Sequence, residues 1–318
     1  MIAALLAALA TSAPLTVVAR VPLPGSATRF DYQSLDSTSG LLYVSHMGAG
    51  RLVVFDTKRR KVVADLPEFP LVTGVLAVPQ EGKVYASAAG AHEVVVMDSG
   101  SQKTLTKVSG ARFPDGIAYV PDEHRVFVSD ESGRIDLAID SKTGEVLAKI
   151  PLEGEAGNTH FDSVGGHVWV AVQTRNQMVE IDPVSMKVVA RHPLAGSDHP
   201  HGFLIDAKDR LAFVSCEGND RLLVAQMPEM TVIQNLEVGG GPDVLAYDRG
   251  LKRLYVGCER GEIDVFRLVG ERLERLGEFR APRAHSVCVD QKTHLVYAPI
   301  EKGPDGPEML ILEPSKGE

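Results

Sequence analysis

Cysteine is scarce in this sequence, which contains only Cys216, Cys258 and Cys288 in 318 residues. An odd number cannot all pair within one chain, so a complete framework of disulfides is excluded. The sequence therefore predicts three small buried apolar side chains, a common environment for free cysteine. Cys216 and Cys258 each precede a glutamate that is a candidate site residue, which leaves a metal or redox role for these two open.

Basic residues are outnumbered, because 33 Lys and Arg against 42 Asp and Glu give a formal net charge of −9. We find no basic tract and no basic stripe with interleaved aromatic residues, so neither nucleic acid nor an anionic membrane surface is expected as a partner. Beyond the N-terminal segment, nothing approaches the roughly twenty consecutive apolar residues of a membrane-spanning helix. We therefore expect no integral membrane segment in the mature protein.

Residues 1–13 differ in composition from the rest of the chain. Met1 to Ala10 is apolar, and Ala8-Leu9-Ala10 or the stretch ending at Ala13 offers the small residues that signal peptidase cleaves. No Lys or Arg precedes the apolar run. The segment fits a signal peptide, truncated at its start, and predicts a periplasmic or secreted protein. The alternative is the apolar N-terminus of a cytoplasmic protein.

An aromatic residue returns at a nearly fixed interval, each time in a short strand-like run such as Leu42-Tyr43-Val44-Ser45. Successive aromatic positions differ by 42, 42, 42, 44, 42 and 42 residues. Seven copies at this period indicate a repeat architecture, because one such unit cannot bury its apolar face without neighbours. The aromatic residues are Tyr43, Tyr85, Phe127, Trp169, Phe213, Tyr255 and Tyr297.

Each unit has four short strand-like segments separated by turn residues, which is the content of one propeller blade. In the third copy the segments are 116–120, 125–129, 134–140 and 145–150. An Asp recurs thirteen residues after the aromatic, for example Asp98 and Asp140. We expect this carboxylate to accept hydrogen bonds from backbone N–H groups of a hairpin turn.

The two ends of the chain predict how the ring of blades closes. The seventh copy ends after three strands, at about Met309 to Leu312, and segment 17–23 nearly repeats segment 188–194, the fourth strand of the fourth copy. The N-terminal strand should therefore complete the last blade, which removes an open edge. We predict an all-β fold, a seven-bladed β-propeller of four-stranded blades closed in this way, as a single domain over residues 14–318.

The Leu/Val-Tyr-Val-Ser runs, the Asp-Thr/Ser turns and the following Lys-Val-Val strands resemble the YVTN-type repeats of bacterial seven-bladed β-propellers, a group that includes YncE-like periplasmic proteins. The resemblance covers about residues 15–314. It implies a propeller fold and a binding or interaction protein of the periplasm. It says little about chemistry, because propellers carry many functions on one scaffold.

The repeat register predicts ionisable residues at one mouth of the central channel, where the innermost strands start and the loops between second and third strands open. Twelve residues before the aromatic are Asp31, Thr73, Asp115, His201, Asp243 and His285. In the fourth copy we take the next turn to be shortened to Gly165-Gly166, so His160 or Thr159 is expected to fill the position. Four residues after the aromatic are Glu131, Gln173, Glu217, Glu259 and Glu301.

Imidazole and carboxylate groups together suit one divalent transition metal ion. We expect His160, His201 and His285, from three blades, to bind that ion. The carboxylates expected to bind a ligand are Asp31, Asp115, Asp243, Glu131 and Glu301. The alternative is structural: an Asp or His at the start of a blade satisfies backbone donors of the turn between blades.

Two classes of function fit these residues. The first is a secreted or periplasmic propeller that binds a small molecule, a metal ion or a protein partner at the channel mouth. The second is a metal-dependent enzyme of the lactonase, hydrolase or lyase type. In it the ion polarises a carbonyl or activates water, and Glu217 or Glu259 moves a proton. A copper or iron centre for electron transfer would use the same histidines, and whether the protein is an enzyme stays open.

Overall fold

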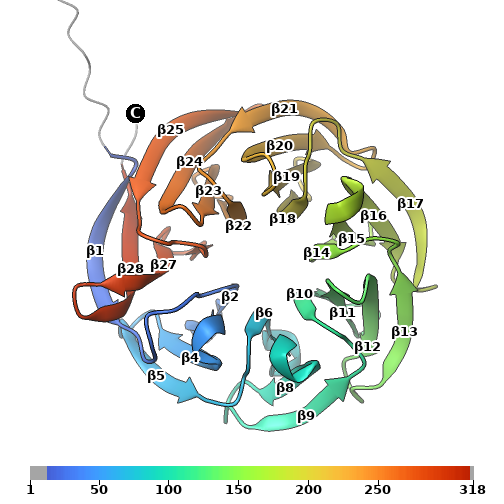
Figure 1. Cartoon of the computed structure of the whole chain (residues 1–318), viewed down its shortest axis with the longest axis horizontal. Coiled ribbons are helices and arrows are strands. Elements are labelled where there is room, and N and C mark those ends of the chain that lie inside the picture. Colours follow the sequence, from blue (N-terminus) through green and yellow to red (C-terminus); the bar gives the residue numbers. More distant parts are fainter. Residues whose placement is uncertain (1–12, 316–318) are drawn as a thin grey trace, which may run out of the picture.

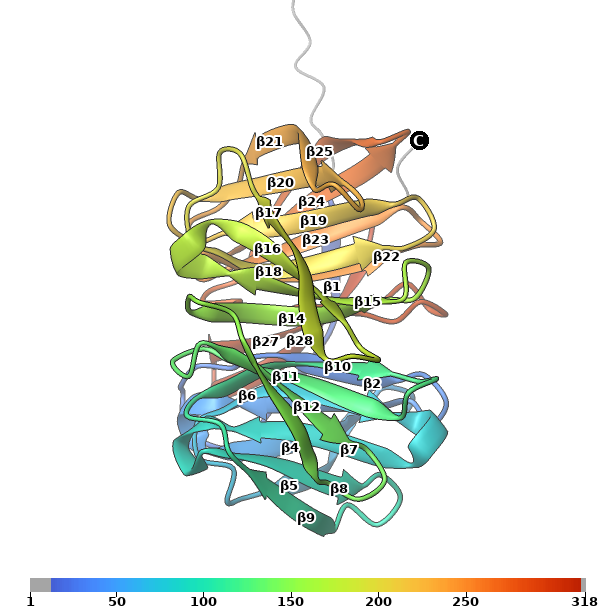
Figure 2. The same cartoon turned by 90° about the vertical axis from the view of Figure 1, so that its right-hand side faces the viewer.

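The computed structural model of the protein describes residues 13–315. Over this range the chain forms strands β1 to β28, arranged as seven four-stranded antiparallel sheets around a central axis (Figure 1). Seen from the side, inner strands such as β14 and β22 run across the thickness of the ring (Figure 2). The predicted all-β seven-bladed propeller is confirmed. The predicted signal peptide falls almost wholly on residues 1–12, outside the described residues.

Blades 1 to 3 follow the sequence from the innermost to the outermost strand. Blade 1 consists of β2 (Gln33–Asp36), β3 (Leu41–His46), β4 (Arg51–Asp56) and β5 (Lys61–Leu66). Blade 2 consists of β6 (Val72–Val78), β7 (Lys83–Ala88), β8 (Glu93–Asp98) and β9 (Thr104–Ser109). Blade 3 consists of β10 (Pro114–Val120), β11 (Arg125–Asp130), β12 (Ile135–Asp140) and β13 (Val146–Pro151).

Blades 4 to 6 repeat this order. Blade 4 consists of β14 (Ala156–Asp162), β15 (His167–Val172), β16 (Gln177–Asp182) and β17 (Lys187–Pro193). Blade 5 consists of β18 (Pro200–Asp206), β19 (Leu211–Cys216), β20 (Arg221–Gln226) and β21 (Thr231–Glu237). Blade 6 consists of β22 (Pro242–Asp248), β23 (Arg253–Cys258), β24 (Glu262–Val269) and β25 (Arg272–Arg280).

Blade 7 is built from both ends of the chain. Its strands are β26 (Cys288–Val289), β27 (Val296–Gly303), β28 (Gly306–Pro314) and, outermost, β1 (Leu15–Pro22). β1 pairs antiparallel with β28 from Leu15 opposite Pro314 to Pro22 opposite Glu308. In Figure 1 the blue β1 lies directly beside the red β28. The predicted closure by the N-terminal strand is therefore confirmed.

Among the described residues, helical structure is limited to single 3₁₀ turns, η1 (Met47–Ala49), η2 (Pro79–Glu81), η3 (Ala89–Ala91) and η4 (Gln173–Arg175). Across residues 13–315 we find no helix with the length and apolar character needed to cross a membrane.

The core lies between the blades. The repeated aromatic residues on the second strands are buried, and Tyr43 and Phe213 are fully inaccessible. One apolar cluster joins Tyr43 and Val54 of blade 1 to Val84 of blade 2, and the other clusters join blades in the same way. Each blade therefore completes the core of its neighbour. Truncating one of the repeated aromatic residues to alanine lowers the free energy of unfolding by about 3–5 kcal/mol.

In blades 2 and 5, the serine two residues after the repeated aromatic contacts the start of the next blade. Ser87 Oγ donates to the carbonyl oxygen of Asp115 at 2.7 Å, and Ser215 Oγ donates to that of Asp243 at 2.8 Å. This approach requires glycine, because a Cβ on Gly202 would lie 1.8 Å from the Asp243 carbonyl oxygen. The repeat thus brings the starts of adjacent inner strands close together.

The recurring Asp forms the outer hairpin turn as predicted. Asp98 Oδ1 accepts from the backbone N–H of Ser101 at 2.7 Å, and Asp140 Oδ1 accepts from that of Thr143 at 2.8 Å. Hydrogen bonds from the hydroxyl and from the backbone N–H of Ser101 lower the pKa of Asp98, and the hydroxyl contributes most.

Candidate functional site

Ionisable side chains from different blades meet where the inner strands start. They occupy the position twelve residues before the repeated aromatic. Each is buried, with an exposed fraction of 8% or less. This group, called the ring below, consists of Asp31, Asp115, His201, Asp243 and His285.

Asp243 is the centre of the ring. Its Oδ1 lies 2.7 Å from Nδ1 of His201, and its Oδ2 lies 2.7 Å from Nε2 of His285. Burial alone would lower the pKa of each imidazole, but Asp243 and the other carboxylates nearby together outweigh burial and raise both pKa values well above the ordinary value. Burial would raise the pKa of Asp243, and the two histidines instead lower it well below its usual range.

Further carboxylates surround the two histidines. Asp115 Oδ2 lies 3.5 Å from His201 Nε2, and Asp31 Oδ1 lies 3.5 Å from His285 Nε2. Burial first, and then the neighbouring carboxylates, raise the pKa of Asp115 although His201 opposes the shift. The ring therefore holds more acidic groups than its two imidazoles neutralise.

Two glutamates from the loops between second and third strands approach from the solvent side. Glu217 Oε1 lies 3.5 Å from Nδ1 of His201, and Glu259 Oε1 lies 3.1 Å from Nδ1 of His285. Burial and the Asp243 charge raise the pKa of Glu217 to about 7. The side chains are 34% and 44% exposed, so both carboxylates connect the ring to solvent.

Arg29 is a site residue that the sequence analysis missed. Its Nη1 lies 2.6 Å from Glu259 Oε1, and its Nη2 lies 2.9 Å from His285 Nε2 and 3.7 Å from Asp243 Oδ2. The guanidinium is thus a cation at the acidic ring. The signal in the sequence was its place two residues before Asp31.

Two buried carboxylate oxygens of the ring, Asp115 Oδ2 and Asp243 Oδ2, accept no hydrogen bond. Asp243 Oδ2 is close to His285 Nε2, but this contact is an ion pair without hydrogen-bond alignment. Each of these oxygens faces an imidazole nitrogen through charge alone, so a cation can replace the imidazole proton as its partner.

Metal-ligating atoms form two clusters, one within the ring and one between the ring and Glu217. One set contains an oxygen of Asp31, an oxygen of Asp243 and a nitrogen of His285, and the other contains atoms of His201, Glu217 and Asp243. Within each set all three atoms lie within 4.8 Å of one another. Both sets share Asp243, and both mix imidazole with carboxylate as zinc and manganese sites do.

The predicted position of His160 in the ring is wrong. The turn that follows β14 is not shortened: Gly166 N donates to Asp162 O at 2.8 Å, as Gly40 N does to Asp36 O. The offset of twelve residues therefore holds in blade 4 and places Gly157 at the ring position.

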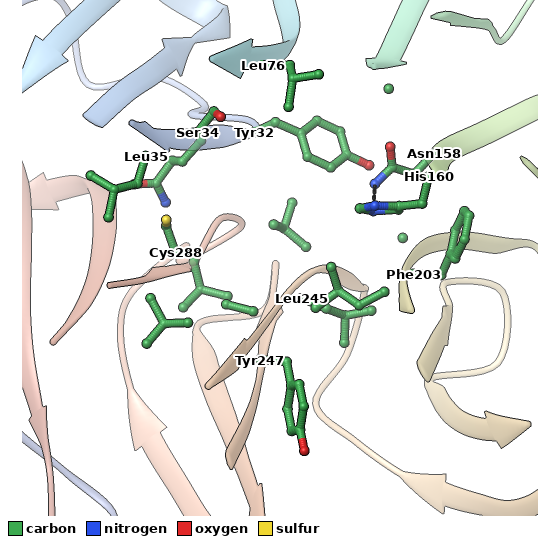
Figure 3. Close-up of a pocket in the computed structure, with 18 of the residues that line it drawn as sticks. Tyr32, Ser34, Leu35, Leu76, Asn158, His160, Phe203, Leu245, Tyr247 and Cys288 are labelled. Atoms are coloured by element: carbon green, nitrogen blue, oxygen red, sulfur yellow. Dashed lines mark hydrogen bonds between the residues drawn. The ribbon is translucent and has the colours of Figure 1, made fainter. Parts of the chain in front are cut away.

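His160 lies further along β14, opposite Trp169, and faces a different cavity (Figure 3). Thr159, the other residue considered for this position, is buried and donates to the carbonyl oxygen of Trp169 at 3.2 Å. A metal site on three histidines is therefore not assembled at the ring, because His160 does not reach it.

Glu131 and Glu301 lie at the rim. Burial, followed by the Asp115 charge, raises the pKa of Glu131. Glu301 Oε2 lies 3.4 Å from Nη1 of Arg283. Arg29, Glu259 and His285 line a small cavity of about 160 Å³ together with Glu301 and Arg283. The rim therefore carries both signs of charge.

The cysteines are all free. Cys216 and Cys258 are fully buried, as predicted, and Cys288 is half-buried. Burial raises the pKa of Cys216 and Cys288 to about 12, so neither thiol is ionised near neutral pH.

Comparisons with known proteins identify the fold and no family. No protein-family model matches the sequence, and no curated protein matches it. Among solved structures, the chain is similar to one titled Kuenenia stuttgartiensis Hydrazine Synthase, with a TM-score of 0.79 and 14% sequence identity. The match covers 94% of this chain and 98% of that chain. It shows a seven-bladed β-propeller, and the YVTN-type resemblance stays a prediction.

Proposed function

We propose that this propeller binds one divalent transition metal ion at the ring. The supporting observation is that two sets of metal-ligating atoms share Asp243, a fully buried carboxylate with one oxygen that accepts no hydrogen bond. The first ligand set consists of Asp31, Asp243 and His285. The second consists of Asp243, His201 and Glu217. Ligands from several blades suit a metal site, because the closed propeller holds their side chains rigidly in place.

Charge supports a cation at this place. Two protonated imidazoles and Arg29 face the carboxylates of Asp31, Asp115, Asp243, Glu217 and Glu259. Arg29 is 42% exposed at its side chain, so it can move to solvent when an ion takes its place. A metal ion would also displace the histidine protons, because imidazole binds metals in its neutral form.

Metal content of untagged protein tests this proposal. We expect about one equivalent of zinc, manganese, copper or iron in the wild type and its loss in Asp243→Asn. Asp122→Asn, the same change at an exposed turn, should keep the metal. Wild-type protein that stays metal-free after incubation with each ion and gel filtration would overturn the proposal. The ring would then be a structural cluster neutralised by Arg29.

A metal-dependent hydrolase or lyase is the second candidate. Glu259 favours it, because this half-exposed carboxylate contacts His285 but is in neither ligand set. In that position it can accept a proton from a bound water. Glu259→Gln should then abolish turnover in a panel of esters and lactones while the metal content stays unchanged. If the metal-loaded wild type turns over no member of the panel, the enzyme role is excluded for these substrates and the metal-binding role remains.

We also propose secretion or a periplasmic location, with a small molecule or a protein as the partner at the mouth. The support is the apolar composition of residues 1–10 followed by small residues. N-terminal sequencing of the protein from its native host tests it: a mature chain that starts near residue 14 is expected. A cytoplasmic chain that retains Met1 would contradict it.

A further inference from the structure

A cavity of about 430 Å³ occupies the central channel next to the ring. The residues that line its near end directly follow the ring positions in sequence, among them Tyr32, Gly116, Asn158, Gly202 and Val244. The cavity therefore continues along the channel axis from the ring. Its volume falls in the range of about 300–1,000 Å³ that holds small organic ligands.

The wall of this cavity is mainly apolar. It is lined by side chains of successive inner strands, including Leu76 of β6, Ile117 of β10, Phe203 of β18 and Leu245 of β22 (Figure 3). Propeller blades surround a central channel, and in this protein that channel is open and mainly apolar beside the ring. An open apolar space of this size is therefore suited to a hydrophobic guest.

Three polar groups gather on one side of the cavity. In Figure 3 the Tyr32 ring extends across the channel and its hydroxyl points toward Asn158 and His160. Asn158 Nδ2 lies 3.1 Å from His160 Nε2, so these two groups are already hydrogen-bonded to each other. Tyr32 is 8% exposed and its hydroxyl has no hydrogen-bond partner. An unpaired buried hydroxyl is costly, and a bound oxygen atom would remove that cost.

The acidic ring disfavours an anionic guest, and the apolar wall of the cavity disfavours a charged guest of either sign. Burial lowers the pKa of His160 to about 4, so its imidazole is neutral near pH 7. A tyrosine hydroxyl is a hydrogen-bond donor near pH 7. The ring carboxylates repel an anion at this end. Arg249, the cation among the lining residues, follows β22 at the other end of the inner strand.

We propose that the channel cavity binds a neutral, predominantly apolar small molecule with a carbonyl or ether oxygen, and that this oxygen accepts a hydrogen bond from Tyr32. The apolar walls enclose the hydrocarbon part, and the hydroxyl fixes its orientation. This site is separate from the ring and does not depend on a metal ion. It adds a second ligand class to the cationic one proposed for the mouth.

Binding of Prodan, a neutral fluorescent naphthyl ketone, tests the inference in the full-length protein. We expect saturable binding with a blue-shifted emission in the wild type. Tyr32→Phe should weaken the affinity roughly threefold to tenfold, the range for one net hydrogen bond. Tyr247→Phe is the matched control, since this tyrosine lines the same cavity and its hydroxyl already pairs with Asp206; its affinity should be unchanged.

Leu245→Trp fills the cavity and should abolish Prodan binding; if it does not fold, Leu76→Trp on the opposite wall replaces it. Methyl naphthoate should displace Prodan at least tenfold more effectively than the naphthoate anion. Prodan binding that survives a folded cavity-filling variant would overturn the inference. Equal effects of Tyr32→Phe and Tyr247→Phe, or equal competition by ester and anion, would overturn it as well.

Discussion

His201 and Asp243 occupy the same repeat position in adjacent blades, and Nδ1 of His201 lies 2.7 Å from Oδ1 of Asp243. The other oxygen of the same carboxylate contacts His285. One residue thus pairs with two buried imidazoles, whose pKa values it raises.

Loss of this carboxylate should destabilise the metal-free protein. Asp243→Ala leaves two buried imidazoles without their main partner, and breaking a buried ion pair costs about 3–5 kcal/mol. We expect the free energy of unfolding to fall by about 3 kcal/mol in urea titrations of chelator-treated protein. Asp122→Ala, at an exposed turn, should change it by less than about 0.5 kcal/mol. A cost for Asp243→Ala as small as that of the control would contradict the central role of the carboxylate.

A second prediction concerns acid stability between blades 2 and 3. Glu81 accepts hydrogen bonds from the hydroxyls of Tyr119 at 2.8 Å and Ser141 at 2.5 Å. Burial would raise the pKa of Glu81, but these bonds, His124 and Lys83 lower it to about 2. A depressed folded-state pKa adds stability above the unfolded-state value near 4.5, and this stability is lost as the pH falls toward 2.

Glu81→Gln should therefore cost about 2 kcal/mol at pH 7 and clearly less at pH 3. Denaturant titrations of both proteins at the two pH values measure the difference. Glu68→Gln, an exposed site, serves as the control. A cost that is equal at both pH values would show that the Glu81 charge contributes nothing.

A third prediction concerns Asp136 in β12, which is fully buried and whose two carboxylate oxygens have no hydrogen-bond partner. Leu222 of β20 and Met178 of β16 stand at the corresponding position. Burial raises the pKa of Asp136 to about 8. The unfolded chain loses this proton near pH 4 and the folded chain keeps it, so Asp136 weakens the fold progressively between about pH 4 and pH 8.

Asp136→Asn, which stays neutral, should be more stable than the wild type at pH 8 by about 3 kcal/mol, with little difference at pH 4. Thermal unfolding at the two pH values provides the measurement. An Asn variant less stable than the wild type at pH 8 would mean that the ionised Asp136 has a partner.

A fourth prediction concerns the closure of the propeller by β1. Deletion of residues 1–22 removes β1, including the buried Leu15, and exposes the edge of β28. We expect a loss of about 4 kcal/mol, from buried apolar side chains and lost strand pairing, and faster hydrogen exchange in β28. Deletion of residues 1–12 alone is the control, because it leaves β1 intact. Equal melting temperatures for the two truncated proteins would argue against a stabilising role of β1.

The sequence predicted the fold because its signals are periodic. The aromatic of each copy stands in one register, so the offset of twelve residues located Asp31, Asp115, His201, Asp243 and His285 correctly. The prediction for His160 failed where that offset was set aside for an assumed short turn. Arg29 and the free hydroxyl of Tyr32 depend on side-chain directions between blades, which a repeat pattern does not contain. The cavity depends on which inner side chains leave space, and composition gives no measure of that.

The pairing of Leu15 with Pro314 determines the order in which the protein can be completed during synthesis. Blades 1 to 6 each use one continuous segment, so they can form as the chain emerges. Blade 7 needs its first-made strand and its last-made strand together, and bringing such distant segments into contact is slow. A chain in which blades 1 to 6 have formed still has an open edge with an apolar seam, and at that stage a chaperone or an export factor can hold it.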